Sequence, residues 1–272
     1  MSALARHTPS SAQASGAPLI ACRDVVLRAG QRTLVSGLSF EVHAGERWVL
    51  LGPNGAGKST LIATLCGLRE PEAGTVELAG VPLARLSVQQ AARHRALVTD
   101  RWLDAFASSV IDTVLTARFL PGIDAAGLAL AEDWLARLDC AELAARDVRS
   151  LSRGERQRVA IATALAQGTP CVLLDEPTAH QDPRHQSLVL QRLGELADHA
   201  LLASMHDLNC AAHFATHAVL LDGRGAWAAG PAAEVLTAAR LSELFGTEVR
   251  ELGTNGERVF VARWPDAGRH GA

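Results

Sequence analysis

The sequence predicts an α/β protein whose core is a mostly parallel sheet, with a helical subdomain inserted into it. Short apolar strands alternate with helical segments in the second half of the chain, which is the pattern of a largely parallel sheet. Between about residues 108 and 148 the apolar side chains recur at helical spacing without a strand pattern, which predicts the insert. A glycine-rich segment at 52–60 lies between a short apolar strand and a helix.

The first half of the chain is expected to contain mostly strands. Residues 1–17, rich in Ser, Ala and Pro, are expected to form a disordered leader. A capping box formed by Ser87 and Gln90 predicts a short helix. Strands are expected at 20–27, 38–42, 47–51, 74–80 and 96–99.

The second half is expected to alternate helices and strands and to end in hairpins. Asn255 and Gly256 form a strong turn signal between two short apolar segments. We therefore expect one main domain at 18–250, with the helical insert at about 102–150, and a C-terminal hairpin and tail at 251–272. The other expected elements are helices at 152–166, 183–196, 208–214 and 241–245, a further short helix marked by Pro231, strands at 171–174 and 201–204, and a hairpin at 218–229.

Composition excludes several classes of protein. The net charge of −3 gives no basic field for nucleic acid, so no nucleic-acid partner is expected. The five cysteines are scattered without a C-x-x-C pair, which indicates neither a disulfide framework nor a zinc site and fits a reducing, intracellular location. No apolar segment approaches the roughly 20 residues that span a bilayer. Any work at a membrane is therefore expected to go through a partner protein.

The glycine-rich segment has the spacing of a phosphate-binding loop. Glycines let successive backbone N–H groups turn toward a phosphate. The helix expected from Lys58 to about Cys66, where Gly67 stops it, adds its N-terminal partial positive charge. Lys58 can reach the β- and γ-phosphates, and the Ser59 hydroxyl can bind Mg²⁺. An ordinary glycine-rich turn is the alternative, and the strand–loop–helix context argues against it. The expected phosphate-binding residues are Gly52, Asn54, Gly55, Ala56, Gly57, Lys58, Ser59 and Thr60.

Two adjacent acids follow the apolar strand at 171–174. Because ligands lie outside the carboxyl ends of parallel strands, Asp175 is placed to hold Mg²⁺ near the phosphate loop. Glu176 is placed to polarise a water aimed at the γ-phosphate. A solvated acidic turn is the alternative, and it would be favoured if the phosphate loop were not present.

Two further segments carry potential phosphate contacts. Ser152 and Glu155 form a capping box, so a second helix N-terminus offers an anion site; the alternative is simply a well-capped helix with a basic face. His206 follows the apolar strand 201–204. A histidine there is by default a turn residue with satisfied hydrogen bonds, but after a neighbouring parallel strand it can also face the γ-phosphate.

The order of these motifs strongly resembles the ATPase subunits of ABC transporters, over about residues 18–250. Carried over residue by residue, Gly52–Thr60 resembles the Walker A motif and Asp175 the Walker B acid. Glu176 resembles the catalytic carboxylate and His206 the switch histidine. The signature motif is matched by Leu151–Glu155, including Ser152, Arg153, Gly154 and Glu155, and the D-loop by Ala179–Asp182.

The resemblance implies a P-loop NTPase fold with an N-terminal antiparallel β subdomain. It also implies an Mg²⁺-dependent ATPase that forms a head-to-tail homodimer. Each ATP then lies between Walker A of one copy and the signature motif of the other. Two membrane permease subunits are implied as partners, and a periplasmic binding protein takes part indirectly. The implied location is peripheral, at the cytoplasmic face of the inner membrane.

Three positions depart from the family pattern. Arg153 stands where the second residue after the signature leucine is usually glycine. Asp100 stands at the Q-loop position, where glutamine is usual, so its coupling to a transport subunit is in question. Ala29 stands where an aromatic side chain usually stacks on adenine, and the chain has no Tyr. We expect weaker nucleotide binding rather than loss of hydrolysis.

Several segments resemble the importer subfamily for iron–siderophores, haem and cobalamin. They include His185 and Gln186, the segment 206–209, and the C-terminal segments 230–236 and 245–249. Residues 105–110 and 152–158 most resemble the cobalamin type, so uptake of cobalamin is slightly favoured.

Two alternatives remain open. One is a nucleotide-gated binding module with negligible hydrolysis. Asp100 and Ala29 support this alternative, and the presence of Glu176 and His206 argues against it. The other is a soluble ABC protein that does not transport. Such proteins usually carry two cassettes or a long coiled-coil insert, and neither is visible in this chain.

Overall fold

The computed structural model describes residues 16–99, 107–120, 122–254 and 257–263. In this part of the chain the core is a six-stranded sheet of order β10-β9-β3-β8-β7-β6. Only β10 pairs antiparallel, so the mostly parallel sheet that the sequence predicts is confirmed. The strands are β3 (Arg47–Leu51), β6 (Arg95–Val98), β7 (Cys171–Asp175), β8 (Ala200–Ser204), β9 (His217–Leu221) and β10 (Trp227–Pro231).

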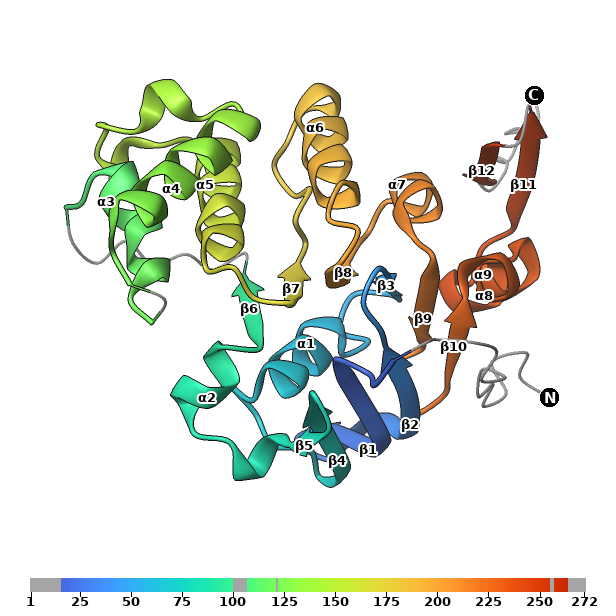
Figure 1. Ribbon diagram of the computed structural model, residues 1–272. Helices are drawn as coiled ribbons and strands as arrows, with labels where there is room; N and C mark the ends of the chain where they lie inside the picture. Colours follow the sequence, from blue (N-terminus) through green and yellow to red (C-terminus); the bar gives the residue numbers. More distant parts are fainter. Residues whose placement is uncertain (1–15, 100–106, 121, 255–256, 264–272) are drawn as a thin grey trace, which may run out of the picture.

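Both faces of this sheet are covered, which explains why its strands are nearly continuous apolar segments. Alternate residues of β3 belong to two different cores: Val49 and Leu51 to one, Trp48 and Leu50 to the other. The first core contains α5 (Arg153–Ala166), α6 (Pro183–Gly194) and α7 (Leu208–Phe214), and the second contains α1 (Lys58–Cys66). Figure 1 shows α1 between the core strands and a second sheet.

The second sheet is antiparallel, with the order β2-β1-β4-β5. It consists of β1 (Ile20–Ala29), β2 (Arg32–Val42), β4 (Ala73–Leu78) and β5 (Val81–Pro82). Its apolar face packs on α1, which makes it the N-terminal antiparallel subdomain that the family resemblance implies. The sequence did not predict residues 32–37 of β2, because Ser36 and Gly37 break the apolar alternation there.

The insert is helical, as the sequence predicts. It contains α3 (Val110–Leu115) and α4 (Ala125–Arg137), with 3-10 turns at Thr116–Arg118, Ala141–Leu143 and Val148–Ser150. Both helices pack on α5, so the insert is attached to the core through the helix that Ser152 caps. Figure 1 shows α3, α4 and α5 together at one side of the molecule.

The remaining elements lie near their expected positions. The capping box of Ser87 and Gln90 is present at α2 (Val88–Ala92), which follows a 3-10 turn at Leu83–Arg85. The last elements in the described residues are α8 (Ala232–Val235), α9 (Ala238–Phe245) and the hairpin of β11 (Val249–Thr254) and β12 (Glu257–Ala262). The expected turn residues Asn255 and Gly256, most of the leader and Asp100 lie outside the described residues.

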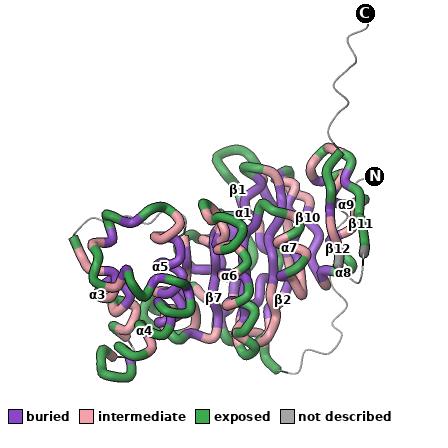
Figure 2. The backbone as a smooth tube through the Cα atoms, turned by 90° about the horizontal axis from the view of Figure 1, so that it is seen from above, coloured by how far each residue is buried: buried purple, intermediate pink, exposed green. Residues whose placement is uncertain are grey.

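Burial is high in the core sheet, where every residue of β7 and β8 is buried. Figure 2 shows buried segments, in purple, through the centre of the molecule. Within the described ranges, none of the helices has the length and apolar character that a membrane span requires.

Candidate nucleotide site

The phosphate loop joins β3 to α1, and the positions of Gly52 and Gly57 in it favour glycine for two different reasons. A Cβ on Gly52 would lie 2.2 Å from the Leu221 carbonyl oxygen, so no other residue fits there. Gly57 caps α1 at a φ of 105°, a left-handed conformation that glycine adopts without strain. The helix spans Lys58–Cys66 and is closed by Gly67, as the sequence predicts. The N-terminus of α1 therefore follows directly on the glycines of the phosphate loop.

Lys58 is almost fully buried at this loop, with 6% of the residue exposed. Its Nζ donates to the carbonyl oxygen of Gly52 at 2.8 Å and to that of Pro53 at 3.4 Å. Burial lowers the pKa of Lys58, and the nearby carboxylates of Glu176 and Asp175 oppose that shift. The ammonium group therefore lies within electrostatic reach of both acids, while the neighbouring Ser59 is exposed.

Asp175 ends β7 and is held by a residue of the adjacent strand. The Ser204 hydroxyl donates to Asp175 Oδ1 at 2.5 Å and accepts the backbone N–H of Glu176 at 2.9 Å. Ser204 is fully buried and pairs with Asp175 in the β7–β8 register. Sequence reasoning missed Ser204, although a serine that ends a buried strand next to an acidic strand end was a usable signal.

Glu176 and His206 meet although 30 residues separate them. His206 Nε2 lies 2.6 Å from Glu176 Oε1, and both side chains are partly exposed. Glu176 adopts a φ of 53°, which is strained for a residue with a side chain. Lys58, Asp175, Glu176 and His206 therefore converge at the carboxyl ends of β3, β7 and β8, where the sequence places them.

The second expected anion site is a capped helix end on α5. The Ser152 hydroxyl accepts the Glu155 N–H at 3.2 Å, and the Glu155 carboxylate accepts the Ser152 N–H at 2.7 Å. These bonds from Ser152 hold the pKa of Glu155 below its ordinary value. Ser152 and Arg153 are exposed. In the described residues, no hydrogen bond or ion pair links Ser152 to the phosphate loop of its own chain.

Asp182 caps α6. Its carboxylate accepts the backbone N–H of His185 at 2.9 Å and lies 2.8 Å from His185 Nδ1, and these bonds lower the pKa of Asp182. His185 Nε2 also lies 3.4 Å from Asp139 Oδ2, just after the end of α4. The histidine thus bridges the start of α6 to the helical insert. The neighbouring Gln186 donates to the Thr178 carbonyl oxygen at 3.4 Å.

One more side chain lies close to the phosphate loop and was missed from the sequence. Arg32, at the start of β2, donates from Nε to the Gly223 carbonyl oxygen at 2.9 Å. A Cβ on Gly223 would lie 2.7 Å from Ala56 Cα, so Gly223 is packed directly on the loop. Ala29 is exposed and pairs with Arg32 across the β1–β2 turn.

A comparison with known protein families agrees with this geometry. Residues 35–179 match the ABC transporter family model. The chain belongs to the ABC transporter family. The matched range includes the phosphate loop, the capped end of α5 and the acids that end β7. The chain is an ATP-binding subunit of this family and an ATPase, as the motif order predicts.

The names of relatives of this ABC ATPase refer to the import of hemin or of cobalamin. The hemin import ATP-binding protein HmuV of Thermobifida fusca is 38% identical over 253 residues, 91% of this chain and 89% of that protein. HmuV of Streptomyces coelicolor is also 38% identical, over 90% of this chain and 89% of that protein. The cobalamin import ATP-binding protein BtuD of Halobacterium salinarum is 42% identical over 83% of this chain and 60% of that protein.

Solved structures confirm the fold. An inward-facing structure described as a metal-chelate type ABC transporter superposes with a TM-score of 0.78 at 26% identity, covering 91% of this chain and 98% of that one. The nucleotide-free ATP-binding cassette of another ABC transporter superposes with a TM-score of 0.71 at 19% identity, covering 84% and 95%. The expected P-loop NTPase fold is therefore confirmed.

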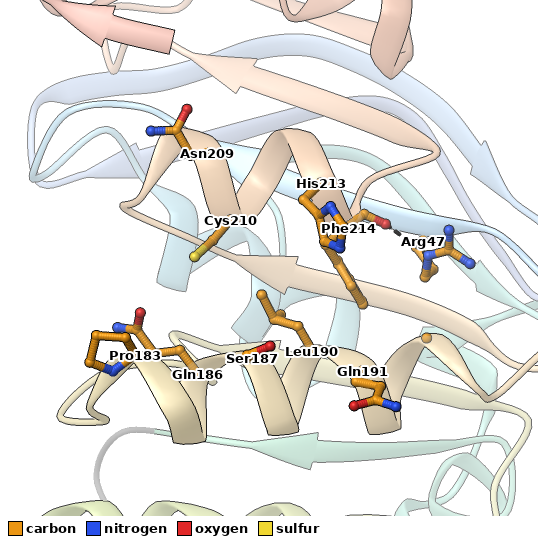
Figure 3. A pocket seen from close by; sticks show the side chains of 11 residues that line it. Arg47, Pro183, Gln186, Ser187, Leu190, Gln191, Asn209, Cys210, His213 and Phe214 are labelled. Atoms are coloured by element: carbon orange, nitrogen blue, oxygen red, sulfur yellow. Dashed lines mark hydrogen bonds between the residues drawn. The ribbon is translucent and has the colours of Figure 1, made fainter. Parts of the chain in front are cut away.

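The ABC ATPase also has a cavity of about 650 Å³ between α6 and α7. Figure 3 shows side chains of both helices facing it, with Arg47 at one end bonded to the Phe214 carbonyl oxygen at 2.8 Å. None of the predicted phosphate-binding residues lines this cavity. It is therefore separate from the nucleotide site. Its lining consists of Arg47, Pro183, Gln186, Ser187, Leu190, Gln191, Gly194, Asn209, Cys210, His213 and Phe214.

Proposed function

We propose that this chain is the ATP-hydrolysing subunit of an ABC importer, and that Glu176 and His206 carry out the hydrolytic step. The observation that carries the proposal is their contact at 2.6 Å, beside the buried Lys58 and Asp175. Glu176 orients the attacking water and His206 holds the γ-phosphate. Phosphoryl transfer needs little covalent chemistry from the protein, so positioning and charge stabilisation account for most of the rate.

The phosphate-binding residues have separate tasks. Lys58 exchanges its bonds to the Gly52 and Pro53 carbonyl oxygens for phosphate oxygens. The loop from Gly52 to Thr60 supplies backbone N–H groups to the same phosphates. Ser59 and Asp175 offer the oxygen donors that Mg²⁺ prefers, and the Ser204 hydroxyl keeps Asp175 in place. Mg²⁺ bound with ATP neutralises charge on the β- and γ-phosphates.

A second copy of the chain completes each site in this proposal. The capped end of α5 is exposed at Ser152 and Arg153, where a helix N-terminus favours an anion. Its position on α5 suits a phosphate that belongs to another molecule better than one held by Lys58 of the same chain. The proposed assembly is a head-to-tail homodimer with two ATP molecules. Asp182, at the start of α6, belongs to the same interface in this proposal.

The proposed partners of the dimer are two membrane permease subunits, with a periplasmic binding protein acting indirectly. The helical insert, with the adjacent Asp100 position, contacts a permease at the cytoplasmic face of the membrane. Closure of the dimer then becomes a motion of the membrane domain. The names of the relatives support import as the direction of transport.

The proposed cargo is a metal tetrapyrrole or a related iron chelate. Hemin importers match over about nine tenths of this chain, and a cobalamin importer matches over a shorter part at slightly higher identity. These similarities do not favour cobalamin, so we propose haem as the first cargo to test and cobalamin as the second. An ATPase subunit does not contact the cargo, so only the complete transporter can decide.

The first experiment measures Mg²⁺-dependent phosphate release by the purified chain, alone and with the permease encoded beside it. Lys58→Ala and Glu176→Gln serve as strongly impaired controls. Release that both substitutions strongly reduce and that the permease stimulates supports a transport motor. ATP binding without release, even with the permease, would overturn hydrolysis in favour of a nucleotide-gated module. Proteoliposomes of the complete transporter then decide between uptake of haem and of cobalamin.

A further inference from the structure

The segment that joins β7 to α6, residues 176–182, carries the proposed catalytic acid at its first position. We refer to it as the catalytic loop. Glu176 has a φ of 53° and His180 a φ of 60°, and neither residue is a glycine. Residues other than glycine keep this left-handed conformation only when surrounding contacts hold them in it. The position of the Glu176 carboxylate therefore depends on whatever holds the rest of the loop.

The loop is held from α5, the helix that Ser152 caps. The side chain of Gln181 donates from Nε2 to the Gly154 carbonyl oxygen at 2.9 Å. Its Oε1 accepts a bond from the Arg158 guanidinium at 3.1 Å. Gln181 thus uses both ends of its amide to connect the loop to two successive turns of α5.

The Arg158 end of this connection is itself firmly anchored. Arg158 is buried, with 6% of the residue exposed, and its Nε donates to the Leu138 carbonyl oxygen at 3.0 Å. The same guanidinium therefore joins the helical insert, α5 and the catalytic loop. A charged hydrogen bond from an immobilised arginine fixes the Gln181 amide more strongly than a bond between neutral groups would.

Close packing at Gly154 supports the same conclusion independently. A Cβ on Gly154 would lie 2.9 Å from the His180 carbonyl oxygen and 3.3 Å from Gln181 Oε1. The backbone of the loop therefore rests directly on the backbone of α5 at this point. By comparison, the other α5 bond to the loop, from Gln157 Nε2 to the Glu176 carbonyl oxygen, is longer at 3.4 Å.

We propose that Gln181 is a positioning residue for ATP hydrolysis. It fastens the strained catalytic loop to α5, so that the Glu176 carboxylate stays in the orientation that meets His206. The bonds of the Gln181 amide go to the Gly154 carbonyl oxygen and to Arg158 rather than to the phosphate loop or Lys58. The end of α5 that is proposed to contact the second copy's ATP keeps its own capping box between Ser152 and Glu155. The expected effect of Gln181 is therefore on turnover and not on ATP binding. The inference rests on the proposed function, because it assigns a role within the same hydrolytic site.

The test compares phosphate release by the full-length wild type and by Gln181→Leu, which keeps similar volume and removes both hydrogen bonds. We expect kcat to fall by about tenfold to a hundredfold, the usual cost of a small misplacement of a catalytic group. KM for ATP should stay within about twofold, because neither the Lys58 contacts in the phosphate loop nor the capping box at the start of α5 involves Gln181. The matched control is Gln191→Leu, an exposed glutamine on α6, which should behave as wild type.

A second variant and a double variant separate positioning from general stability. Gln181→Glu keeps an acceptor for Arg158 but loses the donor to Gly154, so its kcat should lie between those of wild type and Gln181→Leu. If Gln181→Leu does not fold, as judged by its thermal unfolding curve, Gln181→Glu decides alone. Combined with Glu176→Gln, Gln181→Leu should cause almost no further loss, because the carboxylate that it positions is already gone.

The outcomes distinguish this inference from the proposed function. A wild-type chain that releases no phosphate, with or without the permease, overturns both. An active wild type together with a Gln181→Leu variant of unchanged kcat overturns only the positioning role. A rise in KM for ATP as large as the fall in kcat would also contradict the positioning role and indicate a structural one. The same holds if Gln181→Leu lowers kcat as much in the Glu176→Gln background as in wild type.

Discussion

The Nε2 atom of His206 lies 2.6 Å from Oε1 of Glu176, so the ends of β8 and β7 are joined by a contact between an imidazole and a carboxylate. The sequence predicts that both residues face the γ-phosphate, but it does not pair them directly with each other. The contact arises because β7 and β8 are adjacent and parallel, which puts the residues that follow them at one edge of the sheet. The two side chains are therefore expected to act as a unit.

The first prediction concerns this pair. Glu176→Gln should lower kcat by roughly 10² to 10⁴, the range for loss of a positioned general base, and His206→Ala by roughly 10² to 10³, the range for loss of one group that stabilises charge in the transition state. Because the two act together, the double variant should be scarcely slower than the slower single variant. Steady-state phosphate release measures all three. His213→Ala, an exposed histidine on α7, is the control, and losses that multiply in the double variant would contradict a joint role.

The second prediction concerns Ser204, which is fully buried between Asp175 and the backbone of Glu176. Ser204→Ala leaves both of these polar groups without that partner, at a cost of about 1–3 kcal/mol in the free energy of unfolding. It should also raise the Mg²⁺ concentration that gives half-maximal hydrolysis. Urea unfolding and a Mg²⁺ titration measure the two effects. The control is Ser187→Ala at an exposed position on α6, and equal behaviour of the two variants would refute the prediction.

The third prediction compares two glycines with almost the same backbone conformation. Gly223 has a φ of 67° and Gly246 a φ of 66°, so alanine should strain both backbones by about 1–3 kcal/mol. Only at Gly223 would the new Cβ lie 2.7 Å from Ala56 in the phosphate loop, whereas Gly246 has open space. Gly223→Ala should therefore weaken ATP binding, measured by calorimetry, and Gly246→Ala should not. Equal ATP affinities would show that the loop yields without cost.

The parts of the fold that were predicted well depend on local signals. Helix α1 has the predicted bounds Lys58–Cys66, because a glycine loop precedes it and Gly67 ends it. Helix α7 also has its predicted bounds, since the capping residue Asp207 precedes a short apolar helix. In both cases the residues that define the ends are neighbours in the sequence, and no tertiary contact is needed to find them.

The residues that were missed depend on contacts between distant segments. Ser204 acquires its role from the β7–β8 register, and Gln181 from the close packing of its loop on Gly154. Arg32 lies in a part of β2 without apolar alternation, and only its bond to Gly223 places it near the phosphate loop. The roles expected for Asp100 and Ala29 remain predictions, since Asp100 lies outside the described residues and the exposed Ala29 carries no group that could stack on a base.

The fourth prediction concerns acid stability and Glu155. The hydrogen bonds from Ser152 hold the pKa of Glu155 below its ordinary value of 4.5. A carboxyl group with a lowered pKa in the folded state stabilises the fold fully above the unfolded pKa. That contribution is lost as the pH falls through the lower, folded value. The difference in unfolding free energy between wild type and Glu155→Gln should thus be constant from pH 7 to about pH 5 and shrink below about pH 4.5.

Urea unfolding at several pH values measures this difference. Glu142→Gln, an exposed position on a 3-10 turn, is a control that should leave the unfolding free energy at pH 7 unchanged. A difference for Glu155→Gln that grows toward acid pH would mean that the carboxylate opposes folding. In Glu155→Gln the side-chain amide can still accept the Ser152 backbone N–H, but only as a neutral group. Such a result would therefore mean that the negative charge of Glu155 does not strengthen the capping box, and that the Ser152 hydroxyl provides most of its stability.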